Sequence, residues 1–334
     1  MEVKAFAAME ARAALVPYTY EAPTPGPLEV LLEVSHCGIC HSDVHMVDND
    51  WRISRFPLVP GHEVVGTIVA KGDAVDGLDI GQRVGVGWQS GSCMDCEWCA
   101  DGQENLCATS TGTCVGRHGG FGTHMLTDSR FALPIPEGLA SDIAAPLLCG
   151  GITVYSPLRR YGVGAGSRVG VVGIGGLGHL AVQFAHKMGA EVTAFTSSPD
   201  KQALARNLGA NHVVNSRDPQ AIKAARATLD LIVVSATAKL DWRVYVKALR
   251  PNGKVCFVAG SAGNLDIPAG MLIDGQKSVS GSVIGDPGRI REMLAFAAEH
   301  GVGAQIEVMP AAEVNTAMDR VRNNQARFRM VLEM

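Results

Sequence analysis

The chain has 334 residues, of which 47% are apolar and 19% are charged, and its formal net charge is −4. This length is enough for two domains with separate cores, and the apolar fraction excludes long disordered stretches. No run of lysine or arginine exceeds two residues, so the charge pattern argues against a nucleic-acid partner.

Nothing in the sequence indicates a membrane or secretory destination. The first six residues contain an early acid and no apolar core, which is unlike a secretory signal. The charge-poor stretches at 143–158 and 169–186 are too short or too interrupted by polar residues to cross a bilayer. We therefore expect a cytoplasmic protein without a membrane segment.

Residues 1 to about 150 contain short β-branched runs, such as 29–34 and 64–69, separated by glycine and proline. This pattern predicts a β-rich, loop-rich domain. The first region also holds four of the nine cysteines within fifteen residues. An odd total and such clustering favour metal binding over disulfides.

From about Thr153 to Ile284, predicted strands alternate with predicted helices. We expect strands at 168–172, 191–195, 213–214, 231–234 and 255–258, and helices at 177–188 and 201–208. That alternation predicts a Rossmann-type, doubly wound parallel sheet of the α/β class.

The last part of the chain is predicted to return to the first domain. A helix at 290–299 leads into a short β-rich tail ending at 328–332, which resembles the first region in texture. We therefore expect residues 1–151 and 287–334 to form one domain, with a dinucleotide-binding domain of residues 152–286 inserted in it.

Cys93, Cys96, Cys99 and Cys107 are separated by two, two and seven residues. Four thiolates at such spacings can surround one tetrahedral Zn²⁺ and leave no open position, as in a structural site. An iron–sulfur cluster also uses four cysteines but at other spacings, and four unrelated buried cysteines are the remaining interpretation.

The ligands of a second predicted metal site lie far apart in the sequence. The candidates are Cys40, His62 and Cys149, since two cysteines and one histidine supply three ligands and leave one exchangeable position on a catalytic zinc. Taken singly, each residue has a structural alternative as a buried cysteine or a packed histidine. Spacing alone does not link them.

The motifs occur in an order that resembles the zinc-containing medium-chain dehydrogenase/reductases. These motifs are 40–43 (CHSD), 61–66 (GHEVVG), the cysteine lobe and 173–178 (GIGGLG). Within that superfamily the chain is similar to the cinnamyl-alcohol-dehydrogenase branch, and above all to bacterial NADPH-dependent aldehyde reductases. The resemblance covers essentially the whole chain and implies a GroES-like catalytic domain around the Rossmann domain.

The resemblance assigns roles position by position. It makes Cys40, His62 and Cys149 the catalytic zinc ligands, with Glu63 as an acidic neighbour of the metal and Asp43 as the carboxylate that orients His62. Cys37, Cys114 and Cys256 match no ligand position and are interpreted as packing residues.

Further roles follow from the same resemblance. Ser42 matches the hydroxyl that contacts the reacting oxygen, and His45 matches the residue that passes the proton to solvent. His41 is expected at the cofactor pyrophosphate and Thr153 near the nicotinamide. Trp51 and Trp88 are expected to line the substrate cleft, although core packing is the usual role of tryptophan.

The glycine motif after the predicted strand 168–172 indicates a dinucleotide site. Gly173, Gly175 and Gly178, with Gly176 and Leu177 between them, would permit a tight turn and a close approach of pyrophosphate to a helix N-terminus. A purely structural glycine turn is the alternative.

The end of the next strand bears on the choice between NAD and NADP. An NAD site wants an acidic residue there, whereas this chain has Thr196, Ser197 and Ser198, with Lys201 just beyond. Hydroxyls and an ammonium can bind a 2′-phosphate that a carboxylate would repel, so the sequence favours NADP(H).

The sequence therefore predicts an alcohol dehydrogenase or aldehyde reductase with two Zn²⁺ per chain, acting on aliphatic or aromatic aldehydes. One alternative is an NADP-dependent dehydrogenase that works mainly in alcohol oxidation. Another is a catalytically silent, zinc-stabilised NADPH-binding sensor, which would require loss of a ligand or of the relay hydroxyl. Family analogy adds the expectation of a homodimer.

Overall fold

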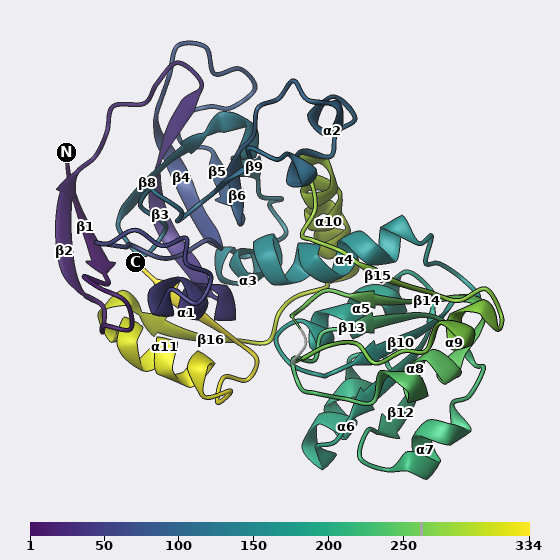
Figure 1. Cartoon of the computed structure of the whole chain (residues 1–334). Helices are drawn as coiled ribbons and strands as arrows, with labels where there is room; N and C mark the ends of the chain where they lie inside the picture. Colours follow the sequence, from purple (N-terminus) through teal and green to yellow (C-terminus); the bar gives the residue numbers. More distant parts are fainter. Residues whose placement is uncertain (261–262) are drawn as a thin grey trace. The chain divides into compact units, whose positions relative to one another are not determined.

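The computed structural model describes residues 1–260 and 263–334, which form two compact units (Figure 1). Unit 1 consists of Met1–Ile152 and Ile284–Met334, and unit 2 of Thr153–Val283. Each unit has its own apolar core. No helix of the described residues is long and apolar enough to span a bilayer.

Unit 1 is built on a seven-stranded sheet in the order β16-β17-β3-β4-β5-β9, with β8 also paired to β3. Two further pairs, β1-β2 and β6-β7, lie outside it. The strands of unit 1 are β1 (Glu2–Ala7), β2 (Val16–Glu21), β3 (Glu29–Ile39), β4 (Val64–Lys71), β5 (Arg83–Val86), β6 (Gln89–Gly91), β7 (Thr111–Gly112), β8 (His124–Asp128), β9 (Leu133–Pro134), β16 (Ile306–Pro310) and β17 (Arg329–Glu333).

The C-terminal strand joins the N-terminal sheet. β17 pairs antiparallel with β3 in the register Met330↔Ile39, and its residues 329–332 are buried. Burial of this apolar segment against β3 accounts for the return of the chain after the inserted unit. The last strand thus lies in the same sheet as β3.

The helices of unit 1 are short and lie in the connections. They are α1 (His41–Asp48), α2 (Glu97–Ala100), α3 (Ser141–Pro146), α10 (Pro287–His300) and α11 (Val314–Arg322), with 3₁₀ turns η1 (Glu104–Leu106), η2 (Ser129–Phe131) and η4 (Ala311–Glu313) and a π-helical turn η3 (Leu147–Gly151).

Unit 2 is a six-stranded parallel sheet in the order β12-β11-β10-β13-β14-β15. Its strands are β10 (Arg168–Val172), β11 (Glu191–Thr196), β12 (His212–Asn215), β13 (Leu229–Val234), β14 (Leu249–Phe257) and β15 (Ser278–Gly281). Its helices are α4 (Ile152–Arg160), α5 (Gly178–Lys187), α6 (Pro199–Asn207), α7 (Pro219–Ala224), α8 (Trp242–Ala248) and α9 (Ala269–Ile273).

The predicted elements of unit 2 are present, with shifted boundaries. α6 begins at Pro199 rather than at 201, because proline with its fixed φ is well suited to a first helical position. β14 begins at Leu249 rather than 255, and α10 of unit 1 begins at Pro287 rather than 290. No element was predicted at helices α4, α7, α8 and α9 or at strand β15.

Candidate functional site

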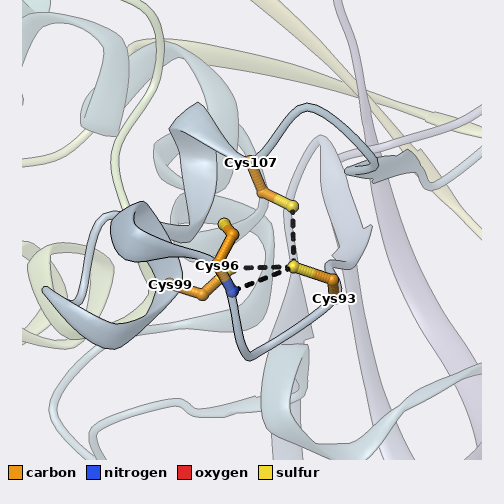
Figure 2. Close-up of side chains that lie close together, drawn as sticks. All are labelled: Cys93, Cys96, Cys99 and Cys107. Carbon is orange, nitrogen blue, oxygen red and sulfur yellow. Dashed lines mark hydrogen bonds between the residues drawn. The ribbon is translucent and has the colours of Figure 1, made fainter.

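The four clustered cysteines lie in a lobe with little regular structure, between β6 and β7 (Figure 2). Their sulfur atoms all lie within 4.8 Å of one another. The Cys93 Sγ is 3.9 Å from the Cys99 Sγ and 3.5 Å from the Cys107 Sγ, and the Cys96 backbone N–H donates to it at 3.4 Å. The predicted set is thus brought together by α2, η1 and the turns around them.

These sulfur separations fit a tetrahedral metal site. A Zn–S bond of about 2.3 Å places tetrahedral sulfurs about 3.8 Å apart, whereas a disulfide holds them at about 2.05 Å. All nine cysteines, each in the described part of the chain, are free thiols. The donor set and its spacing therefore suit one Zn²⁺ with no open position.

The second set comes from three separate segments of unit 1. Cys40 follows β3 and precedes α1, His62 and Glu63 lie just before β4, and Cys149 lies in η3. One ligand atom from each of these four residues lies within 4.8 Å of the others. The pairing of β3 with β4 brings the first two segments together.

Asp43 connects the fold of α1 to this set. Its Oδ2 accepts from the Cys40 backbone N–H at 2.9 Å, which caps the start of α1. Its Oδ1 lies 2.9 Å from the His62 Nδ1 and accepts from the Gly61 N–H at 2.9 Å. The histidine ring is therefore held by Nδ1, and its Nε2 faces the other members of the set.

The His62 Nε2 atom is the observation that points to a metal. It is buried and has no hydrogen-bond partner among the described residues, an arrangement that is costly unless a ligand takes up the lone pair. The pKa of the Cys40 thiol is held well below its usual range by a hydrogen bond from Cys149, and His62 and Arg329 lower it further. One imidazole nitrogen, a thiolate and a second sulfur match a catalytic Zn²⁺.

Arg329, which was not predicted from the sequence, supplies a positive charge next to the Glu63 carboxylate of this set. Its guanidinium donates to the Glu63 Oε1, and both side chains are buried. Burial raises the pKa of Glu63 to about 7, against the opposing effect of Arg329. Its Oε2 has no partner among the described residues. Arg329 lies on β17, 266 residues from Glu63, so no local pattern could have identified it.

The expected relay residues lie on α1 beside the ligands. The Ser42 hydroxyl is 3.7 Å from the Cys40 Sγ, and His45 lies one turn further along with its Nδ1 2.7 Å from the Asp50 Oδ2. The His45 side chain is partly exposed, as a group that exchanges protons with solvent must be. His41 begins α1 and is exposed.

Two tryptophans line one side of the metal set. The Trp88 ring lies 5.0 Å from the His62 ring in an edge-to-face arrangement, and Trp51 packs edge-on against Trp88 at 5.6 Å. Trp51 is 43% exposed, which core packing does not explain. The two rings form an aromatic wall that extends from His62 to the surface of unit 1.

The glycine motif of unit 2 has the geometry of a dinucleotide turn. Gly173 has a φ of +91°, and a Cβ on Gly178 would lie 1.8 Å from the Gly173 carbonyl oxygen, so both positions require glycine. A Cβ on Gly175 would meet nothing within 4 Å. Gly176 and Leu177 complete the turn, and the Leu177 cap supplies no side-chain bond to the first N–H groups of α5. This helix N-terminus has no side-chain cap, which suits a pyrophosphate.

The residues after β11 form a compact turn. Thr196 is 5% exposed, and its Oγ1 accepts from the Ser198 N–H at 3.4 Å, so its hydroxyl organises the turn. Ser197 and Ser198 are half-buried, and the Ser198 hydroxyl does not cap α6 although it occupies the N-cap position. Lys201 is the third residue of α6, and Thr153 is a buried residue in the first turn of α4.

Comparisons with known proteins agree with this arrangement. Residues 26–137 match the model of the alcohol dehydrogenase GroES-like domain, and residues 176–299 match that of the zinc-binding dehydrogenases. Aldehyde reductase AdhA of Synechocystis sp. is 44% identical over 99% of this chain and 98% of its own length.

Solved structures show the same fold. A cinnamyl alcohol dehydrogenase of Sorghum bicolor has a TM-score of 0.94 and 40% identity, covering 100% of this chain and 98% of its own. A CAD of Helicobacter pylori, solved with NADP(H), has a TM-score of 0.92 and 31% identity at the same coverage. The chain therefore belongs to the zinc-containing medium-chain dehydrogenase/reductases and is an alcohol dehydrogenase and aldehyde reductase.

Proposed function

We propose that this enzyme holds two Zn²⁺ per chain and uses NADPH to reduce aliphatic or aromatic aldehydes to primary alcohols. The observation that carries the zinc assignment is the unpartnered, buried His62 Nε2 next to Cys40 and Cys149. The Cys93, Cys96, Cys99 and Cys107 set would hold the second, structural ion. A homodimer remains part of the proposal by resemblance, and analytical ultracentrifugation tests it.

When bound, Zn²⁺ supplies Lewis-acid polarisation of the carbonyl and the nicotinamide supplies hydride. Ser42 would donate its Oγ proton to the substrate oxygen, since its hydroxyl lies beside Cys40. His45, held by Asp50, would then return a proton from solvent to this path. Trp51 and Trp88 would exclude water on one side and favour planar or aliphatic substrates over charged ones.

The roles expected for His41 at the pyrophosphate and for Thr153 near the nicotinamide remain predictions. Glu63 is proposed as a neighbour of the metal that Arg329 holds back from the ligand set. The preference for NADP(H) is supported by Ser197 and Ser198, whose hydroxyls have no hydrogen-bond partner in the described residues, and by Lys201 in the same turn.

The silent-sensor alternative is not favoured, because Cys40, His62, Cys149 and Ser42 are all present and gathered together. A panel of aldehydes assayed for NADPH oxidation tests the proposal, with zinc measured on the same sample. We expect turnover with uncharged aldehydes and two zinc ions per chain. A fully active preparation with one zinc per chain would contradict the assignment of the two sites.

The first prediction concerns the cofactor. Charge-assisted hydrogen bonds contribute roughly 1.5–3 kcal/mol each, so one bond to a 2′-phosphate is worth about tenfold or more. We expect kcat/KM for NADPH to exceed that for NADH by at least about tenfold. Thr196→Asp should reverse the preference, since a carboxylate repels the phosphate. Equal efficiency with both cofactors would show that the turn after β11 is misassigned.

The second prediction concerns the relay. Ser42→Ala removes the hydroxyl but leaves Cys40 and His62 in place, so kcat should fall on the order of 10²–10⁴-fold while NADPH affinity and zinc content stay the same. Single-turnover kinetics isolates the chemical step. Ser35→Ala, on β3, is the matched control. A wild-type single-turnover rate in the Ser42 variant would remove this residue from the mechanism.

A further inference from the structure

The neighbour of β11 in the sheet brings a second charged segment to the proposed 2′-phosphate turn. β12 runs parallel to β11 in the register Thr196↔Asn215, so the two strands end at the same level. The Ser216 N–H donates to the Thr196 carbonyl at 3.2 Å and extends the pairing by one residue. Neighbouring strands are about 4.8 Å apart, so the segment after Asn215 lies directly beside the turn after Thr196.

Residues 215–218 form a fixed turn at this edge. The Asp218 N–H donates to the Asn215 carbonyl at 3.0 Å, and the Arg217 N–H donates to the Asn215 Oδ1 at 3.0 Å. Asp218 then caps α7 by accepting from the Gln220 N–H at 2.9 Å. These bonds hold the backbone of Arg217 in one conformation while leaving its side chain unconstrained.

Arg217 is exposed, and its guanidinium has no hydrogen bond or ion pair within residues 1–260 and 263–334. Asp218 is the next residue in the chain, and Asp200 follows the neighbouring strand β11. One oxygen of Asp218 is engaged in capping α7, and Asp200 lies in the first turn of α6. An unpaired arginine thus stands at the same edge as the hydroxyls of Ser197 and Ser198.

We propose that Arg217 is a specificity-determining residue that binds the 2′-phosphate of NADP(H) from the β12 side, opposite the turn after β11. This inference rests on the proposed use of NADP(H). It adds a residue that lies outside the end of β11, the strand end at which the choice between NAD and NADP was predicted. A planar guanidinium offers two parallel N–H donors to phosphate, which a lysine cannot do. Arg217 therefore supplies the bidentate contact, and the serines supply single hydrogen bonds.

Binding of two cofactor fragments tests the proposal without turnover. Isothermal titration of the full-length protein would compare 2′-phospho-ADP-ribose with ADP-ribose, which differ only in the phosphate. We expect Arg217→Ala to weaken binding of the phosphorylated fragment by at least about tenfold and to leave ADP-ribose binding within twofold. The affinity of Arg217→Lys for the phosphorylated fragment should fall between those of Arg217→Ala and wild type, because lysine keeps the charge but lacks the two parallel N–H donors.

Arg206→Ala is the matched control, since Arg206 is an exposed arginine in the last turn of α6, away from the N-terminus of that helix. It should leave both affinities unchanged. If wild type prefers the phosphorylated fragment and Arg217→Ala keeps that preference in full, Arg217 has no role, and the NADP(H) assignment stands. If wild type binds both fragments equally, the NADP(H) preference itself is wrong and the role of Arg217 falls with it.

Discussion

Asp43 is the residue on which the geometry of the proposed catalytic zinc depends. It is fully buried, and its carboxylate accepts hydrogen bonds from the Cys40 N–H and the Gly61 N–H and binds the His62 Nδ1. One side chain therefore starts helix α1 and orients a proposed metal ligand. The local fold and the site cannot be changed independently at this position.

The third prediction follows from these contacts. Asp43→Asn replaces one acceptor oxygen with an NH₂ group that faces a donor, so the His62 ring loses its fixed orientation. Zinc affinity at the Cys40–His62–Cys149 site should fall about 10–100-fold. Competition with a chromogenic chelator measures it, with the exposed Asp79→Asn as control. Unchanged zinc affinity would show that Asp43 serves only to cap α1.

At the residue scale, the sequence was most informative where function is local. The spacing of Cys93, Cys96, Cys99 and Cys107 could be interpreted directly, because the ligands of a small lobe lie close in the chain. The dispersed set needed the family resemblance, since β-sheet pairing decides which distant residues meet. Arg329 was missed for the same reason, and so was Arg217, whose position depends on β12 pairing with β11.

At the scale of elements, the four-cysteine lobe differs from the rest of unit 1. Its regular structure is limited to the four-residue helix α2, the turn η1 and the two short strands β6 and β7. Such elements cannot bury a core of their own, so we attribute their order to the proposed structural zinc. Elsewhere, strands and helices were predicted well where the apolar periodicity was strong. The predicted start of α6 was too late, because Pro199 was not recognised as its first residue.

The fourth prediction tests the lobe. Cys96→Ser or Cys99→Ser should remove one zinc per chain and lower the melting temperature by several degrees, because structural zinc contributes folding free energy directly. Activity per folded molecule should fall much less than in Cys40→Ser. Cys256→Ser, at a buried cysteine of β14 outside both sets, is the control. Retention of both zinc ions in the Cys96 variant would contradict a four-thiolate site.

At the scale of the whole molecule, the two proposed ligands, Zn²⁺ and NADP(H), bind to different units. Both cysteine-containing metal sets lie entirely in unit 1, whereas the glycine motif and the turns after β11 and β12 lie in unit 2. Each unit has its own apolar core and so can respond locally to its ligand. Although unit 2 is inserted in the chain of unit 1, we expect zinc to affect unit 1 and the cofactor to affect unit 2.

The fifth prediction uses hydrogen exchange to separate them. NADPH and NADH differ only in the 2′-phosphate, so their difference in amide protection at saturation should be confined to residues 196–201 and 215–218. Removal of zinc with a chelator should instead expose amides in residues 93–107, whichever cofactor is present. In Arg217→Ala the cofactor difference should shrink at 215–218 while the chelator effect stays the same. A cofactor difference spread evenly over unit 2, or one located in the cysteine lobe, would show that the phosphate is bound elsewhere.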